Sequence, residues 1–325
     1  MREIKYVEAL NEALKEEMER DPDVILLGED IGKEWQGAFK VTKGLEEIFG
    51  PERVRNTPIS ENSFVGCGVG AAMTGLKPVV EIMFGDLILL AMDQIINQSA
   101  KMRYMSGGQA SVPIVIRTPF GSGGSYASHH SQSLEALFTH IPGLIVVQPS
   151  TPYDAKGLLK TAIRSIDPVM FFEHKFIYKK SGPVPEDEYL IPFGEADIKI
   201  EGSDLTIIAT SMMVWHSIKV AKELKNEGIS VEVVDPRTLV PLDKKTISDS
   251  VKKTGRALIV HEAVSRGGFS GEITKMIIDE AFDYLDAPIK TLGGLPTPIP
   301  FTPNLEKFVV PDPKRIKKAV IELVP

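Results

Sequence analysis

Short apolar runs alternate with helical periodicity through the first half of the chain. The runs contain four to seven apolar residues, about the length of a strand that is buried on both faces. The predicted strands are residues 24–28, 78–84, 112–118, 144–149 and 168–173. The predicted helices are residues 4–20, 62–75, 87–105, 133–140 and 152–165. This order predicts an α/β fold with a parallel sheet covered on both faces.

The pattern is interrupted after residue 174 and then begins again. Residues 179–194 are rich in proline, charge and glycine, a composition typical of a linker. The second half predicts strands at 204–210, 230–235 and 257–263, helices at 213–227, 243–254 and 270–284, and a last helix from about 313. We therefore expect two α/β domains, residues 1–185 and 199–325, joined by a linker at 186–198.

Composition disfavours several kinds of partner. A net charge of −7 disfavours nucleic acid and anionic membrane surfaces, which require a basic face. The most apolar window, residues 78–96, carries Glu81, Asp86 and Asp93, too many charges for a membrane-spanning helix. The single cysteine, Cys67, cannot form an intrachain disulfide and suits a reducing cytoplasm. We expect a cytoplasmic protein with neither nucleic-acid nor membrane partners.

Two segments carry candidate chemistry. In TPISEN, Glu61 is the only carboxylate at the start of a helix of small and apolar residues. A helix-start role is the simple alternative, because Ser60 is a natural N-cap and a first-turn carboxylate interacts favourably with the macrodipole, by about 0.3–1 kcal/mol. The second segment, FGSGGSYASHHSQS, is a glycine-rich loop with His129 and His130 that follows a predicted strand. Parallel sheets bind ligands at this edge, although an ordinary mobile surface loop is the alternative.

Collinear motifs along nearly the whole chain resemble one family. They are LLGEDIG, TPISENSFVG, AMDQIINQSAKMRYMSGG, HHSQSLEALFTHIPGLIVVQPSTPYDAKGLL, DPVMFFEH, DPRTLVPLD, KTGRALIVHEA and GGFSGEI. The chain resembles the beta subunit of the thiamine-diphosphate-dependent dehydrogenase component of 2-oxo acid dehydrogenase complexes, a family with pyruvate, branched-chain and acetoin members. The resemblance implies two transketolase-like domains, a pyrimidine-binding domain followed by a C-terminal domain.

The resemblance also assigns roles to individual residues. Glu61 corresponds to the carboxylate that contacts the aminopyrimidine ring of thiamine diphosphate, Glu29 supports that site, and Ile59 touches the ring. Leu87 stands where relatives often place an aromatic side chain against the pyrimidine, and the nearby Phe84 is a candidate to compensate. His130 corresponds to the histidine implicated in acyl transfer to the lipoyl group. A structural potassium site of some relatives corresponds to backbone oxygens near Ile114, Ala162, Ile163, Ser165 and Asp167, although Ser165 and Asp167 replace the acid and the amide found there.

The partners follow from the resemblance and from one missing motif. Thiamine diphosphate enzymes usually bind magnesium and the diphosphate through a Gly-Asp-Gly motif, which this sequence lacks. We therefore expect the magnesium to be held mainly by an alpha subunit, in an α2β2 assembly. The expected reaction is oxidative decarboxylation of pyruvate or a branched-chain 2-oxo acid, with acyl transfer to the lipoyl group of a dihydrolipoyl acyltransferase.

Three alternatives remain beside this prediction. The chain could be the beta subunit of an acetoin dehydrogenase, or a non-catalytic scaffold subunit that docks the acyltransferase. Retention of Glu61 and of the histidine loop favours a catalytic subunit over the scaffold. Half of a split transketolase or deoxyxylulose-phosphate synthase is disfavoured by HHSQSLEALFTHIPGLIVV.

Overall fold

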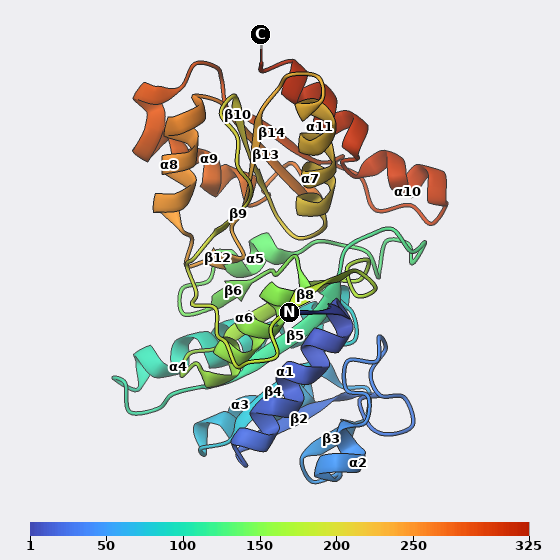
Figure 1. The fold of residues 1–325 in the computed structure, drawn as a ribbon. Helices are drawn as coiled ribbons and strands as arrows, with labels where there is room; N and C mark the ends of the chain where they lie inside the picture. The colour runs from blue at the N-terminus through green and yellow to red at the C-terminus, as the bar shows by residue number, and fades with distance from the viewer. Residues whose placement is uncertain (325) are drawn as a thin grey trace. The chain divides into compact units, whose positions relative to one another are not determined.

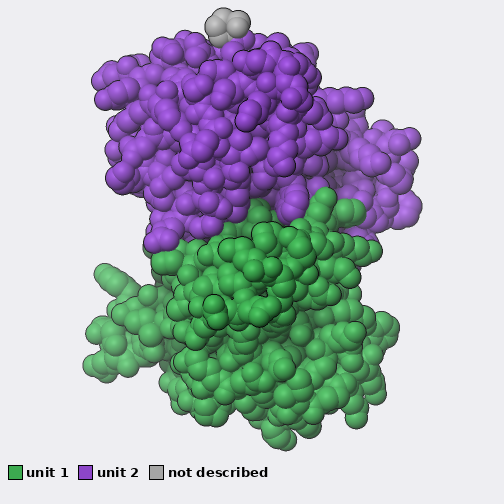
Figure 2. Space-filling model, in the orientation of Figure 1, with its two compact units in different colours: residues 1–120, 137–193 green, residues 121–136, 194–325 purple. Residues whose placement is uncertain are grey.

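The chain forms two compact α/β units. The computed structural model describes residues 1–324. Unit 1 contains residues 1–120 and 137–193, and unit 2 contains residues 121–136 and 194–325; Figure 2 colours the two units separately. The segment 121–136 therefore packs with unit 2, although its place in the sequence is within the first half.

Unit 1 is built on a parallel sheet. Its strands are β2 (Val24–Glu29), β3 (Val54–Thr57), β4 (Lys77–Glu81), β5 (Val115–Phe120), β6 (Ile145–Val147) and β7 (Val169–His174). Their order is β6-β7-β5-β4-β2-β3, and each of these neighbouring pairs is parallel. A separate antiparallel pair joins β1 (Arg2–Lys5) to β8 (Ser181–Val184). The predicted parallel sheet is confirmed.

The helices of unit 1 follow the predicted order. They are α1 (Tyr6–Arg20), α2 (Leu45–Phe49), α3 (Glu61–Met73), η1 (Gly85–Ala91), η2 (Asp93–Ser99), α4 (Ala100–Met105), α6 (Pro152–Arg164), and α5 (Glu135–Thr139), where the chain returns from unit 2. In Figure 1, α1 and α6 run side by side across the sheet. Helix α3 packs closely on the sheet at Gly68, where an added Cβ would lie 2.8 Å from Val80 and 3.1 Å from Ile114.

Unit 2 repeats the architecture with a smaller sheet. Its strands are β9 (Asp197–Ile200), β10 (Leu205–Ala209), β11 (Val231–Asp235), β12 (Thr238–Val240), β13 (Ala257–Val264) and β14 (Lys290–Gly294). The five-stranded sheet has the order β14-β13-β10-β11-β9, in which only β9 is antiparallel to its neighbour. The helices are α7 (Met212–Lys225), α8 (Lys244–Thr254), α9 (Ser270–Ala281), η3 (Phe282–Tyr284), α10 (Pro303–Val309) and α11 (Pro313–Ile321). In Figure 1, α8 and α9 lie on one side of the strands, and α7 and α11 lie on the other.

Two predicted helices differ from the structure. The first begins at Tyr6 and not at residue 4, because residues 2–5 pair as an edge strand with residues 181–184. The predicted helix at 87–105 is divided into a 3₁₀ segment, a π-helical segment and a short α-helix. At the π-helical segment the Ile95 carbonyl accepts the N–H of Ala100, five residues ahead, and also the Ser99 hydroxyl at 2.7 Å. That side-chain bond competes with the regular helical ladder.

Candidate functional site

The carboxyl edge of the unit 1 sheet brings Glu29 and Glu61 into one region. Strand β2 ends at Glu29, which pairs in register with Thr57, the last residue of β3. Three residues then lead to Glu61, the first residue of α3. In parallel sheets the carboxyl ends of the strands, together with the loops that follow them, form the ligand-binding edge. The connection therefore places both carboxylates where a ligand is expected.

Glu61 is buried and has no partner in the described part of the chain. The residue is 5% exposed. Its carboxylate makes no hydrogen bond or ion pair with any of residues 1–324. Ser60 provides no side-chain cap for α3, because its hydroxyl bonds to Ser63 at 2.8 Å instead. A buried carboxylate is costly without a partner, so this site suits a ligand that donates a hydrogen bond.

Glu29 is electrostatically coupled to Glu61. Burial raises the pKa of the Glu29 carboxyl above its usual value, and the negative charges of Asp30 and Glu61 raise it further. A negative charge close to Glu29 disfavours ionisation of the Glu29 carboxyl. A proton or a hydrogen-bond donor at this edge therefore relieves the repulsion between the two carboxylates.

The apolar residues that were predicted near this site have different environments. Ile59, in the loop before α3, is 76% exposed. Leu87 is half-buried in η1. Phe84 packs edge-on against Phe39, with ring centroids 6.0 Å apart, and the Lys175 ammonium lies 5.4 Å from the centroid of its ring. The Phe84 ring is thus already held by neighbours within unit 1.

A buried ionic network that the sequence analysis did not predict connects three strands of the same sheet. The Arg117 guanidinium donates to Glu81 Oε2 at 2.8 Å and to both carboxylate oxygens of Glu173 at 2.7 Å. The Tyr178 hydroxyl also donates to Glu173, at 2.7 Å. Burial alone lowers the pKa of Arg117, but Glu173 and Glu81 raise it above its usual value, so the guanidinium stays charged. The signal in the sequence was a charged residue inside each of three otherwise apolar strands.

The loop after β2 covers this network. Gly37 has a φ of +79°, and a Cβ there would lie 3.1 Å from Glu81 Oε1. The Phe39 ring stacks on Tyr178 with centroids 5.0 Å apart. The loop that begins next to Glu29 therefore rests on the Arg117 network.

His130 belongs to unit 2. It is half-buried in the segment 121–136, and its backbone N–H donates to the Ala127 carbonyl at 3.4 Å. Ser125 and Ala127 have positive φ angles of 58° and 61°, which are unusual for residues other than glycine. The loop therefore has a specific backbone conformation.

The residues that were predicted to hold metal ions form no carboxylate or histidine cluster. Within residues 1–324, no group of three or more His, Cys, Asp or Glu side chains could bind a metal ion. The Ile114 carbonyl accepts the Val169 N–H at 2.9 Å, and the Ala162 carbonyl accepts the Ser165 N–H at 3.2 Å. The Asp167 carbonyl accepts the Ser165 hydroxyl at 3.0 Å. These oxygens already have donors, so potassium there stays a prediction.

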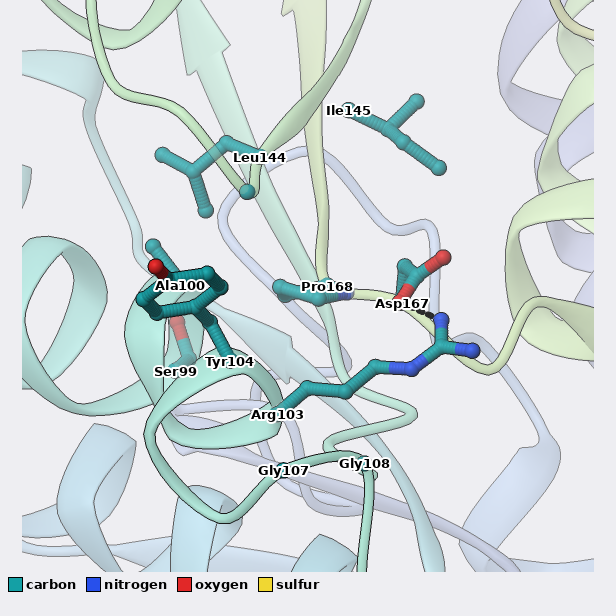
Figure 3. A pocket seen from close by; sticks show the side chains of 11 residues that line it. Ser99, Ala100, Arg103, Tyr104, Gly107, Gly108, Leu144, Ile145, Asp167 and Pro168 are labelled. Carbon is teal, nitrogen blue, oxygen red and sulfur yellow. Dashed lines mark hydrogen bonds and ion pairs between the residues drawn. The ribbon is translucent and has the colours of Figure 1, made fainter. Parts of the chain in front are cut away.

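A mostly apolar pocket of unit 1 lies elsewhere. Its volume is about 600 Å³, and its lining is mostly apolar. Figure 3 shows Arg103 and Asp167 facing each other at this pocket, joined by an ion pair of 2.5 Å. Asp167 is the only predicted site residue in the lining, so the pocket is separate from the Glu29–Glu61 region.

Two family models match this chain. Residues 2–180 match the pyrimidine-binding domain of transketolase, and residues 194–316 match the transketolase C-terminal domain. Among solved structures, a chain described as a split gene transketolase, inactive beta4 tetramer, has a TM-score of 0.77. That match covers 98% of each chain at 21% identity, and it supports the fold alone.

Closer relatives cover nearly the whole chain. The 2-oxoisovalerate dehydrogenase subunit beta of Bacillus subtilis is 48% identical over 322 residues, 98% of each chain. The acetoin:2,6-dichlorophenolindophenol oxidoreductase subunit beta of the same organism is also 48% identical, covering 99% of this chain and 98% of its own. The pyruvate dehydrogenase E1 component subunit beta of Rhizobium meliloti is 48% identical over 96% of this chain and 68% of its own.

These matches confirm the transketolase-like fold and the resemblance on which the sequence analysis relied. The word beta in the relatives' names implies an alpha-subunit partner within a multienzyme complex, and the transketolase-like domains imply the use of thiamine diphosphate. The chain belongs to the family of beta subunits of the E1 component of 2-oxo acid dehydrogenases.

Proposed function

We propose that this chain is a catalytic beta subunit that acts on a 2-oxo acid together with an alpha subunit, in an α2β2 assembly. The observation that supports this most directly is the buried carboxylate of Glu61, which has no partner in residues 1–324 and lies beside Glu29 at the carboxyl edge of a parallel sheet. A scaffold subunit would have no use for an uncompensated buried carboxylate, which costs stability.

The residues of this edge fit the aminopyrimidine ring of thiamine diphosphate. Glu61 would accept a hydrogen bond from the ring nitrogen, and Glu29 would support the site from the end of β2. Ile59 and Leu87 would contact the ring from the loop before α3 and from η1. When bound, thiamine diphosphate supplies the carbanion chemistry that releases carbon dioxide from a 2-oxo acid. Glu61 would hold a proton at the ring nitrogen, the acid–base role that the resemblance assigns to this carboxylate.

We assign the transfer step to His130 and to the lipoyl group of a dihydrolipoyl acyltransferase. In that step a carbon–sulfur bond forms and the lipoyl S–S bond breaks, so the disulfide takes up two electrons as the substrate carbon is oxidised. His130 would give a proton to the sulfur that is released. Magnesium would be held mainly by the alpha subunit, because this sequence lacks the Gly-Asp-Gly motif. The exposed single cysteine, Cys67, is compatible with a reducing compartment such as the cytoplasm.

The test of Glu61 uses the assembled complex and a Glu61→Gln variant. The glutamine keeps the shape but cannot share the ring proton in the same way, so hydrogen–deuterium exchange at the thiazolium carbon should slow by about 10²-fold or more. The exchange is measured by acid quench and NMR, and cofactor binding is measured by calorimetry. Glu280→Gln, an exposed carboxylate on α9, is the matched control. Exchange of the Glu61→Gln complex at the wild-type rate would leave Glu61 as a helix-start carboxylate.

The assembly is tested by titrating the purified chain with magnesium and thiamine diphosphate. We expect negligible binding by the chain alone and recovery of binding after co-expression with an alpha subunit. Micromolar affinity of the lone chain would contradict the division of the site between two polypeptides.

The choice of substrate is tested with a panel. Relatives whose names specify 2-oxoisovalerate, acetoin and pyruvate share the same 48% identity with this chain. Turnover of the three compounds by the assembled complex therefore separates a 2-oxo acid dehydrogenase from an acetoin dehydrogenase. We expect a 2-oxo acid to give the highest kcat/KM.

A further inference from the structure

The histidine loop, residues 121–136, is fixed by two carboxylates of its own unit. The Glu306 carboxylate accepts the backbone N–H of Gly123 on one oxygen at 2.6 Å and that of Ser125 on the other at 3.0 Å. The Glu262 carboxylate accepts the backbone N–H of Ser122 at 2.5 Å. Three N–H groups in four consecutive residues are thus bound by side chains from α10 and β13.

Glu306 binds two of the three loop N–H groups, and Glu262 binds one. Glu306 is 2% exposed, and within residues 1–324 the two loop N–H groups are the only hydrogen-bond partners of its carboxylate. A buried carboxylate with no cation nearby must be stabilised by donors, and charged acceptors form stronger hydrogen bonds than neutral ones. The Glu306 carboxylate and the loop therefore stabilise each other.

Further contacts restrict the rest of the loop. The Ser128 hydroxyl donates to the Ile299 carbonyl at 2.9 Å, and the Gly121 N–H donates to the Gln132 carbonyl at 3.2 Å, closing the base of the loop. His130 lies in the chain between these two points. The left-handed conformations of Ser125 and Ala127 are unfavourable by themselves and persist only where the surroundings determine them. An ordinary mobile surface loop does not have this set of anchors.

We propose that Glu306 and Glu262 are positioning residues for His130, through which the C-terminal domain takes part in acyl transfer. The two carboxylates hold the backbone N–H groups of Ser122, Gly123 and Ser125, in the segment that leads to the histidine. This inference rests on the proposed function of His130 and extends it from one side chain to the domain that supports it. Loss of an anchor should release the loop and impair the step that needs His130, without disturbing Glu61 chemistry.

The central variant is Glu306→Gln, tested in the assembled complex. An amide oxygen can still accept one of the two N–H groups, but the amide nitrogen faces the other, so one bond is lost and the remaining bond is to a neutral acceptor. We expect amide hydrogen exchange of the peptides that cover residues 121–133 to become about 10-fold faster. We also expect reductive acylation of a lipoyl domain to fall by about 10-fold, while decarboxylation with an artificial electron acceptor stays within about twofold of wild type. Glu280→Gln is again the matched control.

Two additional variants keep the test decisive if Glu306→Gln does not fold. Glu262→Gln weakens the second anchor, and Ser128→Ala removes the hydroxyl bond to Ile299 from the half-buried part of the loop. Both should change loop exchange and acylation in the same direction as Glu306→Gln, by smaller factors.

The outcomes separate this inference from the proposed function. Unchanged loop exchange in all three variants would show that the carboxylates do not hold the loop. Faster exchange with unchanged acylation would reject the positioning role. His130→Ala is the reference: if it does not lower acylation more than decarboxylation, the proposed function of His130 fails, and the inference fails with it. Selective loss of acylation in both His130→Ala and Glu306→Gln supports the inference.

Discussion

Replacing Glu135 with glutamine should change how stability depends on pH. Glu135 is a buried residue at the start of α5, and its Oε2 atom has no hydrogen-bond partner within residues 1–324. Burial raises the pKa of this carboxyl to about 7; a hydrogen bond from its own backbone opposes the rise, and the nearby negative charge of Glu262 adds to it. The carboxyl is therefore largely protonated in the folded chain at mildly acidic pH.

The sign and size of the effect follow from linkage. The folded pKa of about 7 lies above the usual value of 4.5, so the folded state binds more protons than the unfolded state between these two values. The contribution of Glu135 to the free energy of unfolding is fully present below pH 4.5 and is lost as the pH rises through 7. Each pKa unit corresponds to about 1.4 kcal/mol, so the loss is of the order of 3 kcal/mol. Glu135→Gln does not ionise and should remove this loss.

The contribution of His261 to stability depends on pH in the opposite direction. Burial lowers the pKa of its imidazole to about 4, from a usual value of 6.5. The contribution of His261 to the free energy of unfolding is present above pH 6.5 and is lost as the pH falls through 4. This loss is also of the order of 3 kcal/mol. Between about pH 4.5 and 6.5 the two contributions offset each other in the wild type. In Glu135→Gln only the His261 contribution remains, so the free energy of unfolding should rise with pH over this range.

The assay compares urea denaturation of wild type and variant from pH 4.5 to 8. Groups common to both proteins cancel in the difference between their unfolding free energies. Relative to wild type, Glu135→Gln should gain roughly 3 kcal/mol between the two ends of this range. Glu280→Gln, which is exposed, should show no such gain. A constant difference between variant and wild type across the whole range would refute the reasoning.

Two further substitutions test the packing of unit 1 by chemical denaturation of the isolated chain. Arg117→Met leaves Glu81 and Glu173 as buried carboxylates without their cation and should cost about 3–5 kcal/mol, whereas Arg103→Met, at a more exposed ion pair, should cost less than about 1 kcal/mol. Equal losses in the two arginine variants would contradict the importance of burial. Gly68→Ala places a Cβ 2.8 Å from Val80 and should destabilise by about 1–3 kcal/mol, whereas Gly70→Ala, with open space on the same helix, should stabilise by up to about 1 kcal/mol. Equal effects of the two alanines would show that α3 does not pack tightly on the sheet.

The elements that the sequence predicted well are those buried on both faces. β2 and β7 are contiguous apolar runs, and a run of that kind between helices has few alternatives. The edge strands β1, β9 and β14 were missed, because their polar residues are compatible with a loop until a partner strand is known. The pairing that forms such edges joins segments far apart in the chain, as in β1 with β8.

Functional residues, too, were predicted where a short local motif contains them and were missed where distant segments must meet. Glu61 and Glu29 were identified because each stands in a short motif, and the register of β2 with β3 brings those motifs together. The Arg117 network was not predicted, because its carboxylates lie 36 and 56 residues away in sequence and meet only in the folded sheet. The anchors of the histidine loop are even more distant, since Glu306 and the Gly123 N–H are separated by 183 residues.

Buried carboxylates in the described residues have different kinds of partner, and the difference supports the role that we propose for Glu61. Glu173 is neutralised by Arg117, and Glu306 is stabilised by backbone N–H groups, so both are satisfied within the fold. Glu135 is relieved by protonation, since its pKa is raised and its unpartnered oxygen is sealed from solvent. Glu61 has neither a cation nor an N–H donor, and it lies next to exposed Ile59 at the edge of a sheet. A cofactor ring with a donor nitrogen would supply the hydrogen bond that Glu61 lacks within residues 1–324, which is the role we propose for this carboxylate.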